Sequence, residues 1–159
     1  MEDRRLPPEF VPRPVQTLRV VMGPQDDAFT DAGLQTFLSE TYTVTPEFDR
    51  MGCRLDGPAI AHKDGGDIIS DGIAFGAIQV PSAGTPIIML ADRQTTGGYT
   101  KIANVITADF RILAQLKTGD KVQFVETPVE YAQSLLLAQR SALKALSKIN
   151  NRGGTSNGV

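Results

Sequence analysis

Four stretches of the sequence place polar or charged side chains beside glycine, at the expected ends of β-strands. Glycine at such positions lets a ligand approach the backbone, or permits the positive φ that some turns require. The most polar stretch follows a hydrophobic segment, where a simple hairpin would need only two residues to reverse the chain. We therefore treat all four as candidate parts of a binding site: DRMGCRLDGP (49–58), SDGIAFGAIQVP (70–81), ADRQTTGGYTKIANVITAD (91–109) and LAQLKTGDKVQF (113–124).

A structural interpretation of the same residues is also open, and the residue types alone favour it. In that interpretation Gly97 and Gly98 form a bulge or a turn, and the arginines pair with nearby aspartates. The aspartates in question are Asp49, Asp56 and Asp92. The spacing of these residues does not decide between a ligand site and a turn.

Several common catalytic centres do not occur in the sequence. One cysteine, Cys53, and one histidine, His62, are too few for a zinc site of the usual nitrogen and sulfur ligands. The P-loop and dinucleotide-binding motifs, G-x-x-x-x-G-K-[ST] and G-x-G-x-x-G, are absent. A Cys53–His62 dyad is conceivable, but no helix or strand pattern brings the two together, and we expect Cys53 to be a packed thiol. Any catalysis must use carboxylates, arginines, amides, hydroxyls and backbone groups.

The composition is that of an ordinary globular protein. The chain has 159 residues, of which 41% are hydrophobic and 21% charged, enough for one domain with its own core. The net charge of −2 offers no basic field for nucleic acid or an anionic membrane. The apolar runs are shorter than the roughly 20 residues of a membrane helix, the N-terminus lacks a signal-peptide core, and the single cysteine fits a reducing compartment. We expect a soluble, cytoplasmic protein.

Short β-branched segments separated by turn residues run through most of the chain. Strands at short spacing with many glycines predict a mainly β fold, a small closed β-barrel with a few short helices. The turn PSAGTP (81–86) predicts a hairpin between two of the strands, and Thr30 is the expected N-cap of a short helix. The expected strands lie at 17–23, 42–48, 67–70, 73–81, 86–92, 101–109 and 117–126.

The two ends of the chain differ from this middle part. Four prolines within residues 1–16 predict an extended linker, followed by the barrel domain over 17–127. A capping box at Thr127–Glu130 and apolar residues at helical spacing predict a long amphipathic helix over 128–150, with a flexible tail over 151–159. The apolar stripe of this helix either packs on the barrel or docks on another protein.

The four polar stretches, in this order, closely resemble the C-terminal half of the biotin-dependent carboxyltransferase family. The family pattern reads approximately R-M-G-x-R-L-x-G, S-[DE]-G-x-x-x-G-x-I-Q-V-P, D-x-Q-T-T-G-G-Y and L-A-Q-x-x-x-G-D. It matches residues 50–57, 70–81, 92–99 and 113–120, and the resemblance extends from about residue 18 to 132. The family includes the C subunit of bacterial 5-oxoprolinase, also known as allophanate hydrolase subunit 2 or KipI antagonist, and the carboxyltransferase region of urea amidolyase.

The resemblance implies a cyclophilin-like β-barrel and an incomplete protein. Family members consist of two such halves, and the N-terminal half-domain is missing from this chain, whose proline-rich segment matches the connector between halves. The resemblance therefore implies two partners, the missing half-domain and a B subunit of the 5-oxoprolinase or KipI type. We expect the chain to be one component of a hydrolase and not to be active alone.

The resemblance also implies a small amide as the substrate, and it assigns roles to the polar residues. Glutamine amides offer both a donor and an acceptor, arginines bind a carboxylate, and two backbone N–H groups stabilise an oxyanion. The implied catalytic residues are Asp92, Arg50 and Tyr99, without a metal. The implied substrate-binding residues are Arg54, Gln79, Gln94, Thr95, Gly97 and Gly98.

Two functions follow from this resemblance as expectations. In the first, the chain contributes to a small-amide site for ATP-dependent hydrolysis of 5-oxoproline, or for carboxyl transfer to urea. It binds no cofactor alone, and ATP or carboxybiotin reaches the site through partner subunits. In the alternative, the chain is a regulatory module of the KipI-antagonist type that binds a partner protein and has no catalysis of its own.

Overall fold

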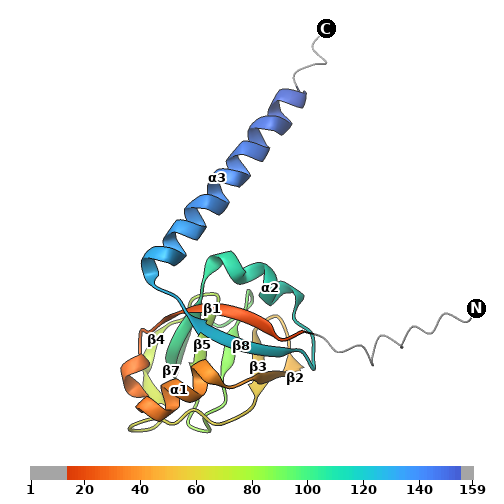
Figure 1. Cartoon of the computed structure of the whole chain (residues 1–159). Coiled ribbons are helices and arrows are strands. Elements are labelled where there is room, and N and C mark those ends of the chain that lie inside the picture. The colour runs from red at the N-terminus through yellow and green to blue at the C-terminus, as the bar shows by residue number, and fades with distance from the viewer. Residues whose placement is uncertain (1–13, 155–159) are drawn as a thin grey trace, which may run out of the picture.

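Eight β-strands form one sheet that closes on itself. The computed structural model describes residues 14–154, and the strands hydrogen-bond in the order β1-β8-β2-β3-β6-β5-β7-β4, with β1 also paired to β7. This pairing makes a ring of seven strands with β4 added on the edge of β7, so the predicted closed β-barrel is confirmed (Figure 1). The strands are β1 (Gln16–Met22), β2 (Tyr42–Phe48), β3 (Gly52–Asp56), β4 (Asp67–Gly72), β5 (Ala77–Val80), β6 (Ile87–Met89), β7 (Thr96–Val105) and β8 (Lys121–Glu126).

Short helices lie against the barrel. They are η2 (Asp26–Ala28), α1 (Asp31–Ser39), η3 (Thr107–Asp109) and α2 (Phe110–Gln115). Thr30 caps α1 as predicted, because its hydroxyl accepts a hydrogen bond of 2.9 Å from the backbone N–H of Gly33. Phe37 on the buried side of α1 stacks on Phe124 of β8, with ring centroids 4.5 Å apart. This contact fixes α1 against the barrel.

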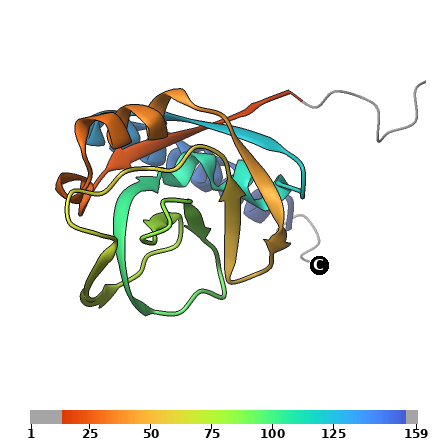
Figure 2. The same cartoon turned by 90° about the horizontal axis from the view of Figure 1, so that it is seen from below.

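Alternating residues of the strands fill the barrel interior. On β3, β5 and β8 every second side chain belongs to the hydrophobic core, and the residues between them face outward. Figure 2, seen from below, shows the strands running around this common interior. The outer face of the same strands is therefore available for a site. The core positions on these three strands are Cys53, Leu55, Ile78, Val80, Val122 and Phe124.

The local predictions around β5, β6 and β7 have different outcomes. The hairpin is confirmed, since β5 and β6 pair antiparallel with Ile78 opposite Ile88. Of the expected bulge or turn at Gly97-Gly98, the turn is wrong, because both residues lie within β7 and Gly97 pairs with Asp71 of β4. The β4–β7 pair does have a register shift between Asp67 and Asp71, opposite these glycines. The partner strand β4 lies about 25 residues earlier in the chain, and no local pattern of threonine and glycine reveals such a pairing.

The C-terminal helix α3 (Val129–Gly154) extends away from the barrel (Figure 1). Only its start lies beside η3, so the expectation that the helix packs along the barrel is wrong over most of its length. Its large apolar side chains are exposed, and Leu143 and Ile149 show 61% and 65% of their surface. No helix within residues 14–154 is long and apolar enough to cross a membrane.

The predicted segments at the chain ends are described only in part. The helix continues to Gly154, four residues beyond its predicted end at 150 and into the range predicted as tail. Residues 1–13 of the predicted linker and 155–159 of the predicted tail lie outside the described residues.

Candidate functional site

An open cavity of about 930 Å³ lies on the outer face of β3, β5, β6 and β7. Its floor consists of the side chains that alternate with the core residues, among them Gly52, Gln79 and Met89. The end of β2 forms one wall, and β4 with the first half of β7 forms the other. We call this cavity the trough. The trough is larger than two other cavities of the barrel surface, which measure about 560 and 470 Å³.

The strand register aligns four outward residues in one row, three of which line the floor of the trough. Arg54 of β3 lies opposite Ile87 of β6, Ile87 lies opposite Gln79 of β5, and Gln79 lies opposite Lys101 of β7. Directly opposed residues of antiparallel strands have their side chains on the same face. Residues that are far apart in sequence therefore form one row, with a cation at each end and an amide between.

Six of the residues that the resemblance implied line the trough together. One of them, Tyr99, was expected to be catalytic, and five were expected to bind substrate. They come from β3, β5 and β7 and from the segment before β7. The structure brings together Arg54, Gln79, Gln94, Gly97, Gly98 and Tyr99.

The remaining three implied residues lie elsewhere. Arg50 and Asp92 line a second, mostly apolar cavity of about 470 Å³ beside α2, which shares the lining residues Phe48 and Asp49 with the trough. Their side chains are 89% and 59% exposed and their closest charged atoms are 4.0 Å apart, as in a weak surface ion pair. Thr95 is absent from the lining of both cavities. A catalytic pairing of Arg50 or Asp92 with the residues of the trough is therefore not seen in this structure.

Gln79 is the most unusual residue of the trough. Its side chain is 5% exposed, and its Nε2 has no hydrogen-bond partner within residues 14–154. An unsatisfied buried donor destabilises a fold by about 1–3 kcal/mol, so such groups are uncommon in structural positions. A Cβ at Gly97 would lie 2.9 Å from this nitrogen, so glycine at 97 leaves the amide room. The amide is available to a carbonyl or carboxylate oxygen of a ligand.

The charge of Arg54 in the trough is partly neutralised by Glu47. Arg54 Nε lies 3.0 Å from Glu47 Oε2 in an ion pair, and both side chains are more than half exposed. The trough also contains Asp67, Ile73 and Met89, which the sequence stretches did not single out for a role. The arrangement suits a small polar molecule, since it offers an amide, a guanidinium, a phenol and carboxylates within one space.

A structural ion pair lies on another side of the barrel. Asp109 accepts hydrogen bonds from Arg19 Nη2 at 2.6 Å, from its Nε at 3.0 Å and from its backbone N–H at 2.8 Å. Burial alone would raise the pKa of Asp109, but the hydrogen bonds from Arg19 outweigh it and hold the pKa below its usual value. The same bonds raise the pKa of Arg19. Both oxygens of this carboxylate face partners, so the pair fixes η3 to β1.

The other titratable candidates give no catalytic centre. Burial raises the pKa of Cys53 to about 12, so its thiol is protonated at neutral pH and the expectation of a packed thiol is confirmed. His62 Nε2 lies 2.9 Å from the carbonyl oxygen of Val80 and 3.1 Å from the Thr100 hydroxyl. No group of three or more histidine, cysteine, aspartate or glutamate residues in the described ranges is arranged to hold a metal ion.

Comparisons with known proteins support the same family as the sequence motifs. The family model "Carboxyltransferase domain, subdomain A and B" matches residues 2–126. The C subunit of 5-oxoprolinase from Haemophilus influenzae is 38% identical over 118 residues, which cover 74% of this chain and 38% of that protein. Urea amidolyase from Saccharomyces cerevisiae is 30% identical over 158 residues, which cover 90% of this chain and 9% of that protein.

A solved structure shows the same fold. The K. lactis urea amidolyase superposes with a TM-score of 0.74 at 27% identity, covering 80% of this chain and 8% of that one. The chain thus spans well under half of the length of these relatives. The matched region covers the whole barrel, including every residue of the trough. On these matches and on its barrel, the chain belongs to the carboxyltransferase domain family, subdomains A and B.

Proposed function

We propose that the trough is the small-amide site of a larger protein, of the type of the 5-oxoprolinase C subunit or of urea amidolyase. The observation that carries this proposal is the buried Nε2 of Gln79, which has no acceptor in the described part of the chain and lines the trough. A carbonyl or carboxylate oxygen of the substrate accepts from this nitrogen. The names of the relatives indicate 5-oxoproline and urea as candidate substrates, both of which carry an amide carbonyl.

The other residues of the trough complete the proposed substrate contacts. Arg54 donates to a second oxygen of the substrate when Glu47 moves aside, which the exposure of both side chains permits. Tyr99, 43% exposed at the rim, forms one wall. The assignment of the Gly97 and Gly98 N–H groups to an oxyanion stays a prediction, as do the roles of Arg50, Asp92, Gln94 and Thr95.

Partners and cofactors belong to the proposal as well. Because the chain covers 38% of its 5-oxoprolinase relative, we assign the remaining groups to the N-terminal half-domain and a B subunit. ATP and carboxybiotin are assigned to partner subunits, since the sequence has no P-loop motif.

The test is an assay of the complete complex. This chain is combined with the N-terminal half-domain and the A and B subunits, and ATP-dependent release of glutamate from 5-oxoproline is measured with each component omitted in turn. Gln79→Leu should lower turnover at least tenfold, whereas Lys121→Met on the exposed face of β8 should leave it within twofold. Full activity of the Gln79→Leu complex would refute the assignment of the trough. Carboxylation of urea in place of glutamate release would indicate the urea branch.

A second candidate function is a regulatory module of the KipI-antagonist type. The observation that favours it is the apolar surface of α3, a helix that extends away from the barrel and has Leu143, Leu146 and Ile149 exposed. A partner protein that covers this surface should lose affinity in a Leu143→Ser, Leu146→Ser variant. The same variant should leave glutamate release unchanged if α3 has no part in catalysis. A B subunit that binds the variant as tightly as the unchanged chain would exclude this use of α3.

A further inference from the structure

Two buried side-chain nitrogen atoms in residues 14–154 have no hydrogen-bond partner, and they lie on neighbouring strands. They are Gln79 Nε2 and Lys101 Nζ. The side chains are 5% and 3% exposed, and the two residues are directly opposed in the β5–β7 pair. Both side chains therefore lie on the outer face of the barrel, the face that bears the trough.

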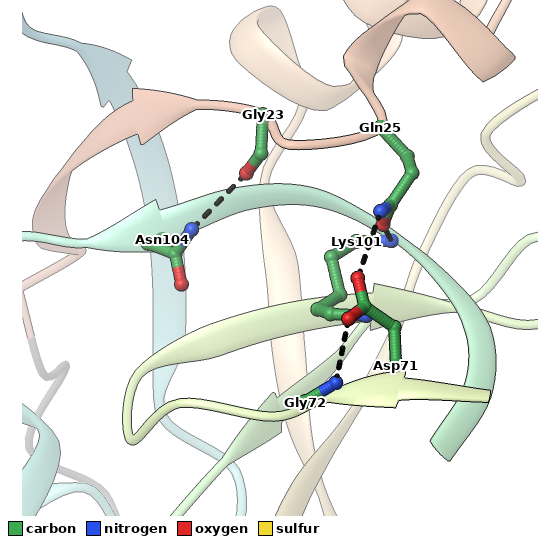
Figure 3. Close-up of polar contacts among 6 residues, drawn as sticks. All are labelled: Gly23, Gln25, Asp71, Gly72, Lys101 and Asn104. Atoms are coloured by element: carbon green, nitrogen blue, oxygen red, sulfur yellow. Dashed lines mark hydrogen bonds and ion pairs between the residues drawn. The ribbon is translucent and has the colours of Figure 1, made fainter. Parts of the chain in front are cut away.

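The two nitrogens lie beside two residues that are opposed in the β4–β7 pair, Gly97 and Asp71. Gln79 Nε2 lies 2.9 Å from the position that a Cβ of Gly97 would occupy. Lys101 is four residues beyond Gly97 on the same strand, so both residues face outward. Its ammonium group reaches toward Asp71, which pairs with Gly97 across β4 and β7 (Figure 3). One buried donor thus lies beside Gly97, which lines the trough, and the other lies beside Asp71, the residue opposed to Gly97.

Asp71 only partly satisfies the Lys101 ammonium. The distance from Lys101 Nζ to Asp71 Oδ2 is 3.9 Å, which is close enough for an ion pair but too long for a hydrogen bond. The Asp71 carboxylate instead accepts from the Gly72 N–H at 2.8 Å and from Gln25 Nε2 at 3.5 Å (Figure 3). Its side chain is 56% exposed, so it can turn toward solvent. The N–H groups of the ammonium remain without an acceptor in the described part of the chain.

We propose that Gln79 Nε2 and Lys101 Nζ together form an anion subsite at Gly97, which binds the carboxylate group of the ligand in the trough. One carboxylate oxygen accepts from the amide and the other accepts from the ammonium, in place of Asp71. The two ends of the row differ in this respect, because Arg54 already has a carboxylate oxygen of Glu47 at 3.0 Å, whereas the nearest carboxylate oxygen to Lys101 Nζ is at 3.9 Å. The identity of the ligand rests on the proposed function, but the anion subsite does not.

Formate, the simplest carboxylate, is the probe for this subsite. The full chain is labelled with ¹³C-lysine and ¹⁵N-glutamine, and the Lys101 Cε and Gln79 Nε2 resonances are followed by NMR during a formate titration. Both resonances should shift along one saturable curve. The Cε resonance of the exposed Lys121 should not follow that curve. Absence of a saturable shift at Lys101 would overturn the subsite.

Variants separate the subsite from the proposed function. Lys101→Met should weaken formate binding at least tenfold, Lys101→Arg should keep most of it, and Lys121→Met should change it less than twofold. In the same assay, 5-oxoproline should lose affinity in Lys101→Met, whereas the uncharged lactam 2-pyrrolidinone should bind that variant as it binds the unchanged chain. Formate binding without any amide binding would retain the subsite and refute the proposed function. Unchanged 5-oxoproline affinity in Lys101→Met would refute the subsite and retain the proposed function.

Discussion

Two of the ion pairs in the described part of the chain contain a buried side chain, and they differ in how completely their atoms are bonded. Asp109 accepts three hydrogen bonds from Arg19 at 2.6–3.0 Å, and its side chain is 2% exposed. Lys101 is the buried member of the other pair, 3% exposed, at 3.9 Å from an Asp71 that is 56% exposed. In the first pair both carboxylate oxygens of the buried member accept hydrogen bonds from Arg19, whereas the second has a buried cation with unused donors. We therefore interpret Arg19–Asp109 as a structural contact and Lys101 as a residue that can bind a ligand.

The largest expected effect concerns the fully bonded pair. Asp109→Ala removes the acceptor of three hydrogen bonds and should lower the free energy of unfolding by about 3 kcal/mol, the lower end for a broken buried pair because Arg19 is 31% exposed. Urea denaturation measures this loss. Asp64→Ala, at an exposed loop position, is the control and should change stability by less than about 0.5 kcal/mol. An equally small loss for Asp109→Ala would remove the distinction between the pairs.

The contribution of the Arg19–Asp109 pair should also be visible in how the free energy of unfolding depends on acid pH. The pKa of Asp109 is below its ordinary value of 3.8 in the folded state, so the pair's contribution is complete above that value and is lost as the pH falls through the lower folded-state pKa. Urea denaturation at several acid and near-neutral pH values is compared for the unchanged chain and Asp109→Ala. The difference in unfolding free energy between the two should shrink only in the acid range. A constant difference down to the lowest pH would show that ionisation of Asp109 contributes nothing.

A smaller effect of opposite sign is expected for the incompletely bonded pair. Lys101→Met keeps the hydrocarbon part of the side chain and removes a buried ammonium that lacks hydrogen bonds. The free energy of unfolding should therefore stay the same or rise by about 1 kcal/mol. Urea denaturation and thermal unfolding both measure it. A loss of more than about 2 kcal/mol would make Lys101–Asp71 a structural pair like Arg19–Asp109.

The smallest effect is expected at the exposed partner. Asp71→Asn keeps the shape of the side chain and an acceptor for the Gly72 N–H, and it removes a charge that is mostly in water. The change in unfolding free energy should be below about 0.5 kcal/mol, measured by urea denaturation. If Asp71→Asn instead lowers stability as much as Asp109→Ala, then Asp71 compensates the buried ammonium more fully than its distance indicates.

Local sequence signals predicted the barrel elements well where the contacts that determine them are local. The Thr30 cap, the hairpin at residues 81–86 and the start of the C-terminal helix near Pro128 each depend on a few adjacent residues. The failure at Gly97-Gly98 has a different cause. Their place in β7 depends on pairing with β4, which is distant in sequence.

The composition of the trough was predictable only in part for the same reason. The resemblance to the family motifs implied six residues that do line the trough. It also implied Arg50 and Asp92, which do not line the trough, because their positions depend on strand ends and on the turn between β2 and β3. Lys101 received no role, because its burial follows from the register of β5 against β7. Had β7 been recognised as a strand, the alternation of Gly97, Tyr99 and Lys101 would have placed all three on one face.

The parallel pairing of β1 with β8 has a mechanical consequence. Gln16 lies opposite Val122 and Val20 opposite Glu126, so the chain enters β1 at one end of this pair and leaves β8 toward α3 at the other (Figure 1). Tension applied between residue 14 and α3 would slide the two strands past each other in shear. All hydrogen bonds between β1 and β8 would bear that load together. In a hairpin pulled from its open end, by contrast, the hydrogen bonds would break one at a time. Motion of a protein attached through α3 would therefore be passed to the barrel as a whole, with the trough keeping its shape.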